Sequence, residues 1–157
     1  MTDTQRRVAA EAFWRDETIS SERAEAVSLL AERLHFRPKS VLGMPIERRT
    51  RALASTHAIS DTLAANLLVA YHLGAQRPMM AAFLDALGIP HDDGLIPEDA
   101  TPHLDEARLE EAVGQLRRSF PPEDVALYLA TLSMQDPDTW KPLERFQEPP
   151  DGTERGA

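Results

Sequence analysis

Cysteine is absent from this chain of 157 residues. Its absence excludes disulfide bonds, thiolate nucleophiles and every zinc site built on sulfur ligands. Three catalytic or nucleotide-binding motifs are also missing: a Gly-x-Ser-x-Gly elbow, a His-Glu-x-x-His helix and a glycine-rich phosphate loop. The sequence therefore carries no catalytic signature of a serine hydrolase, a zinc metalloprotease or a nucleotide-dependent enzyme.

Long hydrophobic runs are scarce as well. The most apolar stretch, residues 63–73, contains Asn66 and His72 and is too short to span a bilayer. No apolar segment of the kind found in secretory signals follows Arg6 and Arg7. We therefore expect a cytoplasmic protein that has no membrane partner.

The chain is acidic, and its charge is unevenly distributed. It has 17 Lys and Arg residues against 26 Asp and Glu residues, a net charge of −9. Residues 1–84 hold 11 basic and 9 acidic side chains, whereas residues 85–157 hold 6 and 17. Because an acidic protein repels phosphate backbones, we expect no nucleic-acid partner. The asymmetry favours a cationic partner, or pairing of the two halves within one molecule or between two copies.

Apolar residues, at 42% of the chain, recur mainly at helical spacing. No alternating pattern of the kind expected for strands extends beyond a few residues. The expected helix caps or first residues are Ser20, Pro45, Ser60, Pro78 and Pro121. The pattern predicts an all-α, compact bundle of about six to seven short helices. A HEAT-like α-helical repeat is the alternative, because helix-opening prolines recur about every forty residues.

The chain is expected to form one helical domain over residues 1–146. Residues 2–17 are predicted to be a peripheral N-terminal helix. Residues 147–157 contain two prolines and two glycines and are predicted to be a disordered C-terminal tail.

The longest predicted loop, residues 89–103, is the first candidate site. Loops of this length in compact domains are often functional. Its candidate binding residues are His91, Asp92, Asp93 and Leu95. Three interpretations stay open: a solvated acidic loop pinned by Leu95 and Ile96, a partner-binding loop, or a site for a divalent metal.

Three histidines, His57, His72 and His91, are candidate metal ligands. We expect His57 and His72 on neighbouring antiparallel helices, where they could form a metal pair or an acid and a base. A buried, hydrogen-bonded histidine is the alternative for His72. We expect no cofactor, and a metal is the alternative.

Basic and aromatic residues supply the candidate interface. Arg48 and Arg51 lie three apart, so they can share a helix face and hold a phosphate, a carboxylate or the acidic half of another chain. A solvated face is the alternative. Phe13, Trp14 and Trp140 are predicted as aromatic anchors of an interface.

These features together predict a non-enzymatic helical protein–protein interaction module that self-associates as a homo-oligomer or binds another protein. The alternative is a small metal- or ligand-binding helical bundle, with a hydrolase as one form of it. That bundle would use His57, His72, His91 and nearby carboxylates.

Overall fold

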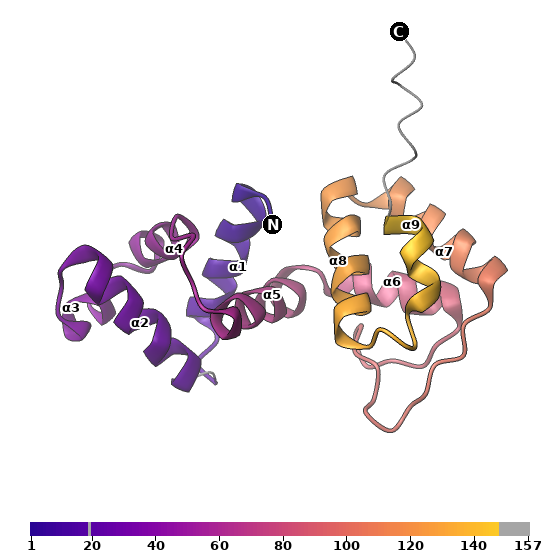
Figure 1. The fold of residues 1–157 in the computed structure, drawn as a ribbon, viewed down its shortest axis with the longest axis horizontal. Coiled ribbons are helices and arrows are strands. Elements are labelled where there is room, and N and C mark those ends of the chain that lie inside the picture. The colour runs from indigo at the N-terminus through magenta and orange to yellow at the C-terminus, as the bar shows by residue number, and fades with distance from the viewer. Residues whose placement is uncertain (19, 148–157) are drawn as a thin grey trace, which may run out of the picture. The chain divides into compact units, whose positions relative to one another are not determined.

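The computed structural model describes residues 1–18 and 20–147. Within these ranges the protein is all-α, with nine α-helices, one 3-10 helix and no strand (Figure 1). The predicted fold class is confirmed. The helix count exceeds the expected six to seven because three one-turn pieces, near residues 40, 142 and 145, count as elements of their own.

The chain divides into two compact units, Met1–Gln76 and a second one that begins at Arg77. The sequence pattern predicted one domain over residues 1–146, whereas each unit of the structure has its own core.

The first unit is built around its N-terminal helix. It contains α1 (Asp3–Arg15), α2 (Ser20–Leu34), α3 (Pro38–Leu42), α4 (Ile46–Ala54) and α5 (Asp61–Ala75). Helix α1 packs mainly against α4 and α5, and α2 packs against α3, α4 and α5. Ala9, Ala10, Phe13 and Trp14 of α1 are buried. The helix predicted to be peripheral therefore supplies much of the core of this unit.

The second unit contains α6 (Arg77–Leu87), α7 (Glu106–Ser119), α8 (Pro122–Gln135), a 3-10 helix (Lys141–Leu143) and α9 (Glu144–Gln147). Helix α6 packs against α7, and α8 packs against α7 and α9. The Phe83 ring meets Tyr128 edge-on at 5.6 Å and lies 6.0 Å from the Trp140 ring. These aromatic contacts close the core of the unit.

The C-terminal prediction fails at its first residue. Gln147 belongs to α9, and its amide donates a 2.6 Å hydrogen bond to the Ser133 hydroxyl. The rest of the predicted tail, residues 148–157, lies outside the described residues. In the described part of the chain, no helix is both long enough and apolar enough to cross a membrane.

Candidate functional site

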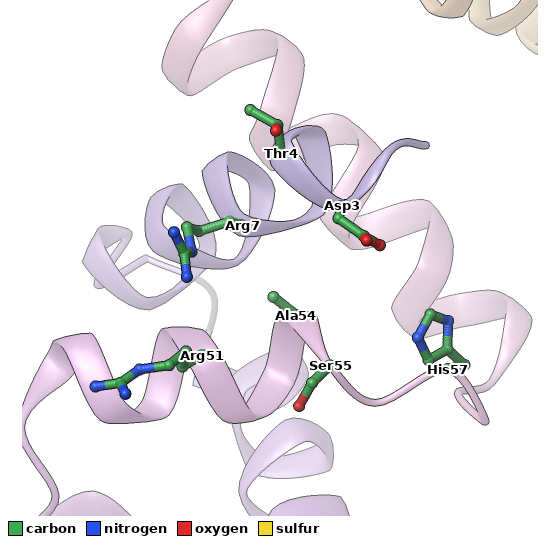
Figure 2. Close-up of a pocket in the computed structure, with 7 residues that line it drawn as sticks. All are labelled: Asp3, Thr4, Arg7, Arg51, Ala54, Ser55 and His57. Atoms are coloured by element: carbon green, nitrogen blue, oxygen red, sulfur yellow. The ribbon is translucent and has the colours of Figure 1, made fainter.

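A partly open pocket of about 410 Å³ lies in the first unit, between α1 and the C-terminal end of α4 (Figure 2). Its lining residues are Asp3, Thr4, Arg7, Arg51, Ala54, Ser55 and His57. Only Arg51 and His57 among them were singled out from the sequence.

Local hydrogen bonds at the N-terminal end of α1 and the C-terminal end of α4 position these side chains. Helix α1 begins with a capping box, in which the Thr2 hydroxyl accepts from the Gln5 backbone and the Gln5 side chain accepts from the Thr2 backbone. This cap fixes the first turn of α1, which carries Asp3 and Thr4. At the end of α4, the Ser55 hydroxyl donates to the Ala52 carbonyl at 3.0 Å.

The register of α1 against α4 is supported by a cation–π contact. The Arg49 guanidinium carbon lies 5.1 Å from the centroid of the Trp14 ring. Burial, and then the charge of Arg23, lower the pKa of Arg49 below its ordinary value. The packing of Arg49 on Trp14 therefore helps to hold together the two helices that carry the pocket.

The pocket has two ends. Figure 2 shows the Arg7 and Arg51 side chains toward one end of the pocket, and Arg7 points from α1 toward α4. The residues toward the other end are His57, Ser55 and Asp3. Within residues 1–18 and 20–147, neither guanidinium has a hydrogen bond or ion pair. The guanidinium end thus has two cations without a carboxylate partner among the described residues.

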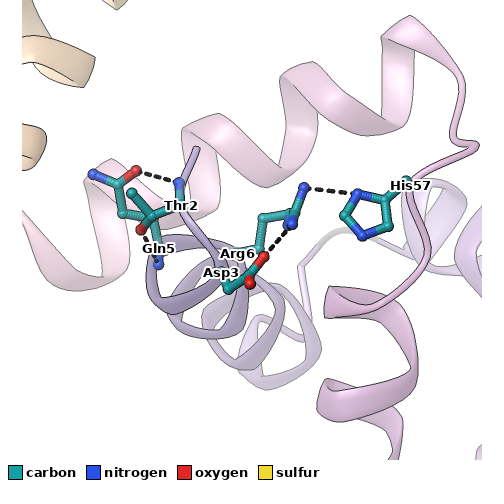
Figure 3. A network of polar contacts seen from close by, with 5 residues as sticks. All are labelled: Thr2, Asp3, Gln5, Arg6 and His57. Atoms are coloured by element: carbon teal, nitrogen blue, oxygen red, sulfur yellow. Dashed lines mark hydrogen bonds and ion pairs between the residues drawn. The ribbon is translucent and has the colours of Figure 1, made fainter.

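A polar network borders the other end (Figure 3). Arg6 lies between two partners: one guanidinium nitrogen is 2.9 Å from His57 Nδ1, and the other bonds the Asp3 carboxylate. A guanidinium can only donate, so Nδ1 accepts and the proton of the neutral imidazole is on Nε2. Arg6 therefore neutralises the charge of Asp3 and leaves the His57 Nε2–H group available as a donor.

Of the predicted pair Arg48 and Arg51, only Arg51 lines the pocket. The Arg48 guanidinium lies 5.8 Å from the Phe36 ring centroid, and Arg48 does not line the pocket. Arg51 instead shares the pocket with Arg7. No local pattern relates Arg7 to Arg51, because they are 44 positions apart and only the packing of α1 on α4 brings them to one pocket.

The predicted aromatic anchors lie in the two cores. Phe13 is 0% exposed, and Trp14 and Trp140 are each 3% exposed. An anchor must be accessible to a partner to bury its surface there. These three residues are therefore not part of the candidate site.

The three candidate histidines have different surroundings. His57 is exposed and lies in the connection between α4 and α5, not on a helix as expected. His72 is buried on α5, with Nδ1 2.9 Å from the Leu68 carbonyl oxygen and its ring edge-on to Tyr71. Among the residues that the structure describes, no three His, Asp or Glu side chains are grouped to hold a metal ion.

His91, in the second unit, holds a turn together. Its Nε2 lies 2.7 Å from the Asp85 carboxylate, and its Nδ1 accepts from the Gly94 backbone at 3.0 Å. Asp92 and Leu95 exchange backbone hydrogen bonds of 2.8 and 3.0 Å. The Asp93 carboxylate pairs with Arg77, and Leu95 is 41% exposed. Both ring nitrogens of His91 are thus engaged, by Asp85 of α6 and by the Gly94 backbone, so His91 offers no free imidazole nitrogen to a metal.

Comparison of the chain with protein-family models, with curated proteins and with solved structures finds no match.

Proposed function

We propose that the chain is a non-enzymatic helical binding module whose first unit holds an anionic group of its ligand in the α1/α4 pocket. One observation carries this proposal: Arg7 and Arg51 line a single pocket and pair with no carboxylate among residues 1–18 and 20–147.

Electrostatics favours an anion there. Two guanidinium groups that line one pocket repel each other, and an anion held in that pocket relieves the repulsion. The planar guanidinium also matches carboxylate and phosphate oxygens with paired hydrogen bonds, which are stronger than bonds between neutral groups.

The contacts of the Ser55 hydroxyl in the pocket support binding rather than covalent catalysis by this residue. The Ser55 hydroxyl donates its proton to the Ala52 carbonyl, and the His57 Nδ1 atom accepts from Arg6. Neither arrangement gives the nucleophile and base pair that acyl or phosphoryl transfer to serine requires.

The proposal is tested with the full chain by following amide chemical shifts during titration with phosphate and, separately, with acetate. We expect at least one anion to shift amides of Asp3–Arg7 and Arg51–His57. Arg7→Gln and Arg51→Gln should each weaken that binding by about tenfold or more, the usual effect of losing a charge-assisted contact. Arg37→Gln is the control, because Arg37 is exposed and does not line the pocket. Absence of any saturable shift, or equal loss in the Arg37 variant, would overturn the proposal.

The charge of the two units favours self-association as a second function. The first unit has 10 Lys and Arg against 9 Asp and Glu, a net charge of +1. The second has 7 against 17, a net charge of −10. Acidic side chains of one copy would then occupy the arginine-lined pocket of another, and the association would weaken with salt. Light scattering at several protein and salt concentrations tests this function, and a strict monomer in low salt would contradict it.

A further inference from the structure

We infer that the ligand of the α1/α4 pocket is a small hydroxylated molecule that carries a phosphate monoester, such as a sugar phosphate. This inference rests on the proposed function and names the ligand class of the same pocket. It is drawn from the charge of the pocket, the division of its polar groups and its size.

The charge of the lining favours a dianion over a carboxylate. Arg7 and Arg51 contribute two positive charges that have no partner in the part of the chain that the structure describes, while the Asp3 charge is compensated by Arg6. A carboxylate would leave one of the two cations uncompensated. A phosphate monoester carries about −1.5 to −2 charges at pH 7 and three strong acceptor oxygens, so its charge matches that of the two guanidinium groups in the lining.

The opposite end of the pocket is suited to hydroxyl groups. His57 offers a donor at Nε2, as its bond with Arg6 requires, whereas Asp3 offers a carboxylate that only accepts. The Ser55 oxygen can also accept, because its proton is given to the Ala52 carbonyl. A hydroxyl group both donates and accepts, and it therefore matches this mixed set better than an apolar chain or a second anion.

The volume leaves room for the carrier of the phosphate. The pocket measures about 410 Å³, which lies in the range of about 300–1,000 Å³ typical of small-molecule sites. A phosphate held at the guanidinium end would leave the space toward His57 and Ser55 for a carrier of several carbon atoms (Figure 2).

Three probes of similar length separate the parts of the inference: ribose 5-phosphate, ribonate and pentyl phosphate. Each is titrated into the full chain, and binding is followed by the amide shifts of the pocket. Ribose 5-phosphate should bind most tightly. Ribonate should bind at least about tenfold more weakly than ribose 5-phosphate, because a carboxylate replaces the dianion. Pentyl phosphate should bind about fivefold more weakly than ribose 5-phosphate, because the hydroxyl groups are lost.

Two variants assign each preference to its end of the pocket. His57→Phe should reduce the affinity for ribose 5-phosphate to about that for pentyl phosphate, because the donor to the hydroxyl groups is lost. Arg51→Gln should weaken both phosphates by a similar factor. Circular dichroism melting of each variant confirms that it folds.

The outcomes separate this inference from the proposed function. If ribonate binds as tightly as ribose 5-phosphate, the phosphate assignment is wrong while the anion-binding function stands. If pentyl phosphate binds as tightly, the hydroxylated carrier is wrong. If none of the three probes binds and acetate and phosphate also fail, the proposed function itself fails.

Discussion

Gly94 occupies a backbone conformation that side chains with a Cβ rarely adopt. Its φ is +90°, and a Cβ there would lie 2.7 Å from Met80 Cβ and 3.3 Å from the Arg77 carbonyl oxygen. Gly94→Ala should therefore destabilise the second unit by about 1–3 kcal/mol, through backbone strain and overpacking. Urea denaturation measures the loss.

Gly43 is the matched control for this substitution. Its φ is −80°, and a Cβ would meet only ordinary contacts of 3.5 and 3.8 Å with the Lys39 and Ser40 carbonyl oxygens. Gly43→Ala should change the free energy of unfolding by less than about 0.5 kcal/mol. Equal effects of the two alanines would show that the turn around Gly94 does not need glycine.

Tyr128 makes the stability of the second unit sensitive to alkali. Burial raises the pKa of its hydroxyl well above the ordinary value of 10.0. Above pH 10 the hydroxyl ionises in the unfolded chain but not in the folded one. The contribution of this pKa difference to the free energy of unfolding is thus complete below pH 10. It is lost as the pH rises above 10, by up to about 1.4 kcal/mol per pH unit.

Tyr128→Phe removes this ionisation and keeps the ring that packs on Phe83. Unfolding free energies measured between pH 8 and pH 11 should fall less steeply in the variant than in the natural chain. Parallel pH profiles would mean that Tyr128 ionises equally in both states.

Single residues of the pocket were only partly predictable from the sequence. Arg51 stood out within a basic stretch, and His57 as one of five histidines. Their roles depend on partners that are remote in sequence: Arg7 shares the pocket with Arg51, and Arg6 determines which nitrogen of His57 accepts. Such partners follow from helix packing, which leaves no local sequence signal.

Helix starts, by contrast, follow from local chemistry and were predicted well. The Ser60 hydroxyl accepts from the Leu63 backbone at 3.1 Å and caps α5, and Pro122 occupies the first turn of α8. The burial of a whole helix is less predictable from local sequence. Helix α5 is apolar almost all round, a pattern typical of a buried helix, yet Val69 is 44% exposed.

The crossing of α1 and α5 depends on Gly74. A Cβ at this helical position would lie 2.7 Å from the Cβ of Ala12. Alanine normally stabilises a helix interior relative to glycine by about 0.5–1 kcal/mol. Here overpacking, typically about 1–3 kcal/mol, should win, so that Gly74→Ala destabilises the first unit.

Gly114, a helical glycine in α7, gives the opposite prediction. The nearest atom to a Cβ there is the flexible end of Arg118, at 3.4 Å. Gly114→Ala should therefore stabilise the protein by about 0.5–1 kcal/mol. Thermal melting of both variants tests the pair, and stabilisation by both would contradict the tight crossing of α1 and α5.

On the scale of the whole molecule, the uneven charge of the sequence coincides with its division into two units. No local pattern marks a domain boundary near Gln76, because α5 ends at Ala75 and α6 begins at Arg77, with one residue between them. Proline- and glycine-rich linkers are the usual boundary signals, and the stretch of this kind between two helices, residues 88–105, falls inside the second unit. The all-α class was predictable from periodicity, whereas the grouping of helices into cores was not.

Each unit buries its own core, so we expect the two to open independently. Native-state hydrogen exchange reports local opening free energies along the chain. Gly74→Ala should accelerate exchange of protected amides up to Gln76 and leave those of α6, α7 and α8 unchanged. Gly94→Ala should do the reverse. If either substitution accelerates exchange equally in both units, the two cores unfold as one cooperative structure, and a change at the α1/α5 crossing would then be felt as far as the Phe83 and Tyr128 rings.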